Sequence, residues 1–170
     1  MIDLSLILTV SAPWIVGFAG EFDEILKQLR SVQTHNPEIR LRLVVLEGRS
    51  MTTLDAQYDE LTRGFELPDY FGRNANALDE CVNDLDWMDF GAMVVLVRDA
   101  QHVLSLESSE KLGSLLDVLW DAGDRWSHPV SVGEEWDRPA ISFHTILVAS
   151  DLSRISQSGF QHAIPVLRLL

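Results

Sequence analysis

Cysteine is almost absent from this sequence. Cys81 is the single cysteine among 170 residues, so no disulfide bond can form within the chain. A chain without internal disulfides is typical of a reducing compartment, and we therefore predict a cytoplasmic protein.

Charge is missing from residues 4–20, which resemble a signal or membrane segment at first sight. An acidic residue, Asp3, precedes this run, whereas a targeting segment begins with basic residues. Pro13, Gly17 and Gly20 interrupt the run, which argues against a membrane-spanning helix. We interpret it as strand material, with strands expected at 4–10 and 14–18.

Basic residues are few. The chain has 13 Lys and Arg against 26 Asp and Glu, which gives a formal net charge of −13. Such a chain repels nucleic acid and anionic membranes, so we predict that neither is a partner. The same charge would attract a basic protein, although acidity can also serve solubility alone.

Recognisable catalytic patterns are missing as well. The sequence has no glycine-rich phosphate loop and no H-x-x-x-H or E-x-x-H spacing. The acidic residues between 79 and 86 lack the spacing of an EF-hand loop. Cys81 falls on the apolar side of a predicted helix, where a small core residue is expected rather than a nucleophile. We predict a protein that is not an enzyme and that has no metal or cofactor.

Apolar strands alternate with amphipathic helices along most of the chain. Residues 41–48, 92–97 and 141–150 read as buried strands, with helices expected at 54–65, after Asn74 and over 112–126. This order predicts an α/β fold with a small, mainly parallel sheet of about three core strands covered by helices. Residues 127–139, with two prolines and a glycine, are predicted to be a loop.

The two ends of the chain extend this core. An apolar stripe from Phe22 to Val32 predicts a helix that ends before the "HNP" at 35–37. We expect residues 1–40 to form a strand–helix extension packed on a core domain of residues 41–150. Residues 151–170 would be a C-terminal tail, in which Pro165 limits a possible edge strand.

The helix after Asn74 has two contrasting faces. Leu78, Cys81, Val82 and Leu85 form its apolar face. The opposite face carries polar residues spaced i, i+3, i+4 and i+7, namely Asn76, Asp79, Glu80 and Asn83. No Lys or Arg occurs between Arg73 and Arg98 to balance these acids. A solvated acidic face is one interpretation; aromatic residues directly before the helix, Tyr70 and Phe71, favour a protein interface instead.

The segment "LPDYFGRNANALDEC", residues 67–81, resembles the central motif of the barstar family, the intracellular inhibitors of barnase-like ribonucleases. The resemblance covers residues 41 to about 150 and implies a barstar-like parallel sheet with helices. It also implies a monomer that binds a small basic ribonuclease and blocks its active site with the acidic helix and the loop before it. The partner-binding residues expected from the helix face and the resemblance are Tyr70, Phe71, Gly72, Asn74, Asn76, Asp79, Glu80, Asn83, Asp84, Trp87 and Asp121.

Several positions depart from the family pattern. Asn76 stands where the family usually has aspartate, Asp79 replaces a tryptophan of barstar, and Arg73 replaces a glutamate. These changes leave a second hypothesis open, in which the same fold binds a different basic protein without inhibiting a ribonuclease. A third, a metal-dependent hydrolase that uses the acidic cluster, would require converging carboxylates.

Overall fold

The fold is built on a parallel sheet whose strands are nearly continuous apolar runs. The computed structural model describes residue 4 and residues 8–167. All pairings in the sheet are parallel, in the order β2-β3-β4-β1-β5. The strands are β1 (Ile15–Phe18), β2 (Leu41–Glu47), β3 (Ala92–Arg98), β4 (Ser142–Val148) and β5 (Val166–Leu167).

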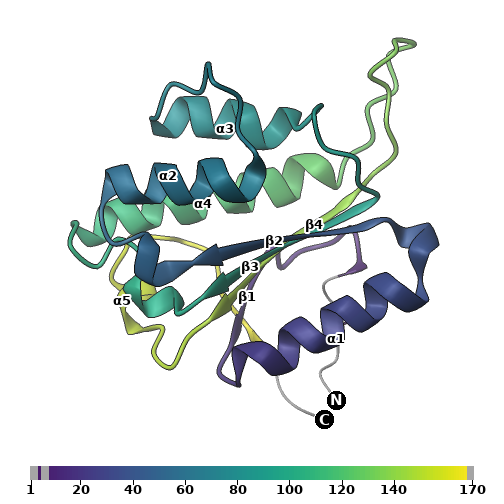
Figure 1. The fold of residues 1–170 in the computed structure, drawn as a ribbon. Coiled ribbons are helices and arrows are strands. Elements are labelled where there is room, and N and C mark those ends of the chain that lie inside the picture. The colour runs from purple at the N-terminus through teal and green to yellow at the C-terminus, as the bar shows by residue number, and fades with distance from the viewer. Residues whose placement is uncertain (1–3, 5–7, 168–170) are drawn as a thin grey trace.

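Helices cover both faces of the sheet, as Figure 1 shows. The helices α2 (Leu54–Phe65), α3 (Ala75–Asp84) and α4 (Ser109–Trp126) lie on one face, and α1 (Phe22–His35) lies on the other. A short helix, α5 (Ser153–Ser156), precedes β5. Three single 3₁₀ turns are η2 (Pro37–Ile39), η3 (Gly48–Ser50) and η4 (Ala100–His102).

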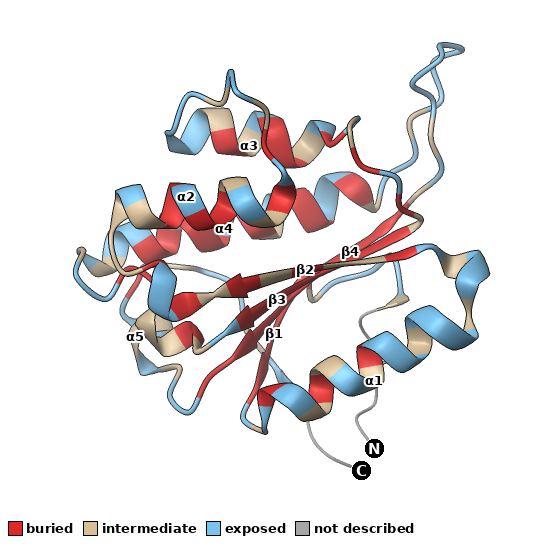
Figure 2. Ribbon diagram, in the orientation of Figure 1, coloured by how far each residue is buried: buried red, intermediate tan, exposed pale blue. Residues whose placement is uncertain are grey.

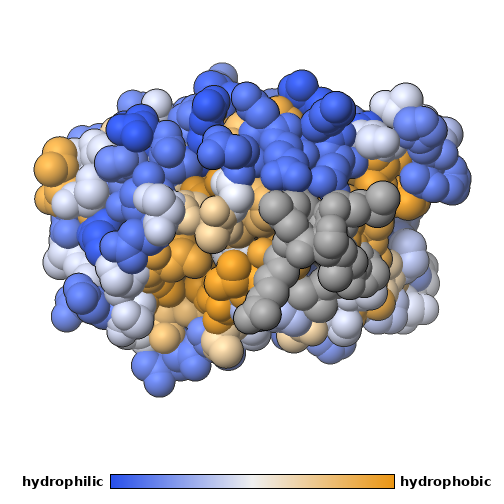
Figure 3. Space-filling view, turned by 90° about the horizontal axis from the view of Figure 1, so that it is seen from below, coloured by the Kyte–Doolittle hydropathy of each residue, from blue (hydrophilic) through white to orange (hydrophobic). Residues whose placement is uncertain are grey.

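Burial follows these layers. β4 is buried along its whole length and β3 at every residue except Arg98 (Figure 2). One apolar cluster joins the upper sheet face to α2, α3 and α4, and a second joins the lower face to α1. Seen from below, apolar side chains gather in the middle of the molecule beside a hydrophilic band (Figure 3). The sheet thus has an apolar core on each side, as a parallel sheet requires.

The predicted fold class is confirmed, with a larger sheet than expected. The three predicted core strands are β2, β3 and β4, and β1 and β5 continue the sheet beyond β4. The expected strand at 14–18 is β1, whose Ile15 is in register with Thr145. The expected strand at 4–10 lies partly outside the described residues, and its described part, residue 4 and residues 8–10, is not a strand. The tail contributes the edge strand β5, where the Pro165 carbonyl accepts a hydrogen bond from the Gly17 N–H at 2.8 Å.

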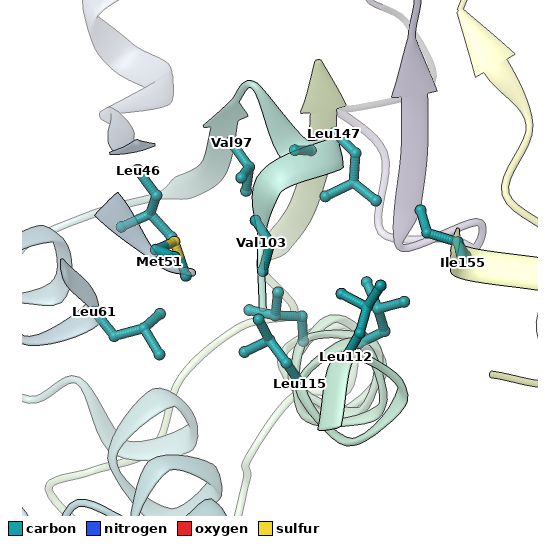
Figure 4. A pocket seen from close by; sticks show the side chains of 12 residues that line it. Leu46, Met51, Leu61, Val97, Val103, Leu112, Leu115, Leu147 and Ile155 are labelled. Carbon is teal, nitrogen blue, oxygen red and sulfur yellow. The ribbon is translucent and has the colours of Figure 1, made fainter. Parts of the chain in front are cut away.

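The interior between the sheet and α4 contains one small apolar void (Figure 4). Leu46, Leu61, Val103 and Leu115 are among the aliphatic residues that line it. Its volume of about 20 Å³ leaves room for little more than one water molecule. This void therefore cannot hold a substrate or cofactor. Within the part of the chain that the structure describes, no helix combines the length and apolarity needed to cross a membrane.

We propose that residues 8–40 fold together with residues 41–150 as one unit. β1 lies between β4 and β5, and its residues Ile15, Val16 and Phe18 are almost completely buried. Burial of one such side chain stabilises a fold by about 1.5–3 kcal/mol. Limited proteolysis should therefore yield no stable fragment that begins near residue 41. Rapid release of a folded 41–170 fragment would contradict this proposal.

Candidate partner-binding site

The helix α3 begins at a well-formed cap. The Asn74 side-chain oxygen accepts a hydrogen bond from the Ala77 N–H at 3.0 Å, and its amide donates to the Gly72 carbonyl at 3.0 Å. Asn74 is therefore already engaged within its own turn, so its first role is to fix where the helix starts. Gly72 is exposed beside it, and a Cβ at this position would lie 3.1 Å from the Asn74 amide.

The apolar side of α3 packs on α4. Leu78, Cys81 and Val82 are buried there. The Trp126 indole of α4 donates to the Val82 carbonyl at 2.9 Å, and Leu85 ends the helix in the left-handed conformation, with φ of 46°. These contacts satisfy backbone groups at the end of the helix. They hold α3 so that its other side faces solvent.

On the outward face of α3, one acidic side chain is neutralised by an ion pair and another is not. Asp79 is half-buried and forms an ion pair with Arg125 of α4 at 3.0 Å. Asn83 donates to the backbone carbonyl of Asp79 at 2.7 Å and to its carboxylate at 3.2 Å. Asn76 and Glu80 are exposed, and no ion pair among the described residues includes Glu80. Glu80 is thus the freely available anion of this face, whereas Asp79 is held by its own chain.

The loop before α3 presents one aromatic ring and holds the other. Tyr70 is 75% exposed, whereas Phe71 is half-buried and packs edge-on against Tyr58 of α2 at 5.7 Å. Arg73 binds Asp59 at 2.7 Å and Asp55 at 3.6 Å, both on α2. The Arg73 charge is therefore turned toward α2 and neutralised there.

A second acidic group lies at the other end of α3, beside Tyr70. Asp84 and Asp86 are exposed. Burial and the neighbouring Asp86 carboxylate raise the pKa of Asp84. Desolvation and then the Asp86 charge raise the pKa of Tyr70. Trp87 is half-buried and donates its indole N–H to the Phe65 carbonyl at 2.9 Å, so it anchors the turn after α3.

The structure also brings Asp121 of α4 into the neighbourhood of α3. The pKa of Asp121 is raised overall. Desolvation is the main cause, and the carboxylates of Asp79, Asp117 and Asp124 add to it, whereas Arg125 acts in the opposite direction. Asp121 is exposed. The expected site residues therefore share one side of the molecule, although Asn74, Asp79 and Trp87 are occupied by internal contacts.

A metal site and a reactive cysteine are the catalytic alternatives for this region. Among residue 4 and residues 8–167, no three His, Cys, Asp or Glu side chains converge as metal ligands. Cys81 is buried, and burial together with the Asp84 and Glu80 charges raises the pKa of its thiol. A raised pKa keeps the sulfur protonated and therefore weakly nucleophilic.

Sequence reasoning predicted residues 127–139 as a loop but did not place them. They project from the fold beside the end of α3 (Figure 1), and a groove separates the two. Trp136 is 66% exposed on this loop. The "GEEW" run at 133–136 could have signalled an exposed acidic turn, but not its position beside Asp84.

Comparison with known sequences identifies the family to which this fold belongs. The family described as Barstar (barnase inhibitor) matches residues 41–146, which is more than half of the chain. The chain belongs to the barstar family. The match runs from β2 to within β4, so β1, α1 and β5 lie outside it.

Individual relatives of this barstar-family chain are more distant. A protein of Bacillus subtilis (strain 168), named "Putative ribonuclease inhibitor YrdF", is 32% identical over 56 residues, covering 33% of this chain and 59% of that protein. Among solved structures, the Aeropyrum pernix ORC2 protein in ADPNP-ADP complexes matches 84% of this chain and 36% of its own, with a TM-score of 0.53. At 16% identity, this second likeness is one of fold alone. The family and the Bacillus relative point to an inhibitor rather than an enzyme.

The Asn74 cap generates a stability prediction. Asn74→Ala removes the acceptor for the Ala77 N–H and should lower the free energy of unfolding by about 1 kcal/mol. Asn76→Ala is the matched control, because the Asn76 side chain is exposed and makes no hydrogen bond within the described residues. It should change stability by less than about 0.5 kcal/mol. Urea denaturation measures both, and equal losses would show that the cap does not hold the helix.

Proposed function

We propose that this protein is a barstar-type inhibitor that binds a small basic ribonuclease one-to-one and occludes its active site. In this proposal α3 and the loop before it enter the cleft of the enzyme. The observation that carries the proposal is Glu80, an exposed carboxylate that forms no ion pair with the described residues, on a helix fixed at both ends. A preorganised anion of this kind suits a cationic site built for RNA phosphates.

The surroundings of Glu80 support the same role. Tyr70 offers a large exposed ring, which can bury apolar area in a complex. Asp84 and Asp86 extend the negative surface beyond the end of α3. Charged groups of this kind speed and orient the encounter, and desolvated aromatic and charged anchors supply most of the affinity; barstar with barnase is itself the standard example of both effects.

A second function is a binding module for another basic protein, without ribonuclease inhibition. Two observations favour it. Asn76 carries no charge, and Arg125 neutralises Asp79, so the helix offers fewer free anions than the resemblance implies. An RNA-cleavage assay separates the two functions, because only an inhibitor lowers the cleavage rate of a barnase-type ribonuclease at stoichiometric concentration.

Removal of Glu80 should weaken the complex strongly. Glu80→Ala should cost about 2–5 kcal/mol of binding to a barnase-type ribonuclease, mainly through faster dissociation, because it leaves a cationic pocket without its anion. Glu80→Asp keeps the charge on a shorter side chain and should bind between Glu80→Ala and the parent. Isothermal titration and stopped-flow dissociation measure these effects.

Glu21→Ala is the control for lost charge. Glu21 is exposed before α1, on the opposite side of the sheet, and its side chain does not cap that helix. This variant should bind like the parent. If Glu80→Ala also binds like the parent, α3 does not fill the cleft and occlusion by this helix is wrong.

Association should depend steeply on salt. The net charge of −13 attracts a basic partner from a distance. Salt weakens this attraction, because at 0.1 M ionic strength charges more than about 10 Å apart are largely screened from each other. Stopped-flow association rates should therefore fall as salt increases, while dissociation rates change less. Association rates that stay flat between low and high salt would count against an acidic docking face.

A further inference from the structure

The loop at residues 127–140 is a built feature rather than a loose connection. Val130 and Arg138 form an antiparallel bridge with two backbone hydrogen bonds of 2.9 Å. The Asp137 carboxylate accepts hydrogen bonds from the Val132 and Gly133 N–H groups at 2.8 and 2.9 Å, which closes the tip. The backbone of the loop is thus fixed before any partner arrives.

Arg138 locks the base of this loop onto α4. Its guanidinium lies 4.1 Å from the centre of the Trp126 ring and donates to the carbonyls of Arg125, Trp126 and His128 at 2.9–3.2 Å. These contacts commit Arg138 to its own chain. Its charge is therefore poorly placed to neutralise acidic residues across the groove.

The tip carries exposed apolar and acidic side chains. Trp136 and Val132 are each 66% exposed, and Glu134 and Glu135 directly precede Trp136. A tryptophan left in water on a rigid loop contributes little to folding. Tryptophan is also among the residues that most often dominate the energy of protein interfaces.

A groove of about 520 Å³ joins this loop to the end of α3. Asn83, Asp84 and Asp86 line one wall, Trp136 and Pro139 line the other, and Phe90 and Trp126 also contribute. Two arginines also border the groove. Arg40 is paired with Asp89 at 2.7 Å, and Arg138 is held by the Trp126 ring and the backbone carbonyls described above. Carboxylates facing a tryptophan suit a Lys or Arg side chain, which can pair with the acids and stack on the ring.

We propose that this groove is a second arm of the partner-binding surface, which takes a basic segment of the same partner with Trp136 as its aromatic anchor. The inference rests on the proposed function for the identity of the partner. Asp84 and Asp86 link the two arms, because they border the groove and also lie near Tyr70. The partner would thus be held between α3 and the projecting loop.

Isothermal titration with catalytically inactive barnase tests the proposal. Trp136→Ala should raise Kd at least about tenfold, and Trp136→Phe should recover part of the loss, because it keeps an aromatic face. Leu106→Ala is the matched control, since Leu106 is 74% exposed and does not border the groove. This variant should bind like the parent. Because Trp136 is exposed, its removal should leave the melting temperature unchanged.

The outcomes separate the two proposals. If Glu80→Ala loses affinity and Trp136→Ala does not, the second arm is wrong and the proposed function stands. If the parent does not bind barnase, a hexa-arginine peptide becomes the probe, with the Trp136 indole N–H followed by NMR. A shift of this signal that Asp84→Ala abolishes would support a groove for basic segments although the proposed function failed. A signal that does not move would overturn the groove as well.

Discussion

The structure depends on burying both faces of a parallel sheet. β3 and β4 are largely buried on each side, so neither face can be left in water. α2 and α4 cover one face and α1 covers the other (Figure 2). α3 packs on α4, farther from the sheet, so one side of it must be apolar while the other is free to carry charge. The core therefore creates an outer helix whose exposed side is available for recognition.

Internal ion pairs decide which charges that outer helix offers. Arg125 takes up Asp79, and Arg73 is taken up by Asp55 and Asp59 of α2. Exposed pairs of this kind add little to stability, typically below about 1 kcal/mol each. They also determine which acids stay free, because Glu80, Asp84 and Asp86 form no ion pair with any described residue. Few of the thirteen basic residues are left to neutralise the site, so the net negative charge of the chain is also felt locally at this surface.

Periodicity predicted most of the elements correctly, because each strand and helix carries its own burial pattern. The apolar stripe of α1, the Asn74 cap and the buried runs of β2, β3 and β4 all lie where the sequence indicated. The expected core of about three strands is part of a sheet of five, because the expected strand at 14–18 (β1) and the possible edge strand of the tail (β5) both pair into it. The four residues of β1 and the two of β5 carry little periodic signal. β1 lies beside β4, and β5 beside β1, through pairing between residues more than a hundred positions apart.

The sequence by itself determined the fold class, the start of α3 and the set of acidic and aromatic residues around it, since these follow from local spacing and from a long ungapped motif. Tertiary structure decided which of those residues are free. Asp79, Asn74 and Trp87 look as available as Glu80 and Tyr70 in the sequence, but Arg125, the Ala77 N–H and the Phe65 carbonyl engage them. It also placed Trp136 across a groove from Asp84, fifty-two positions earlier. Such pairings depend on how α3, α4 and the projecting loop pack, and no local pattern encodes that packing.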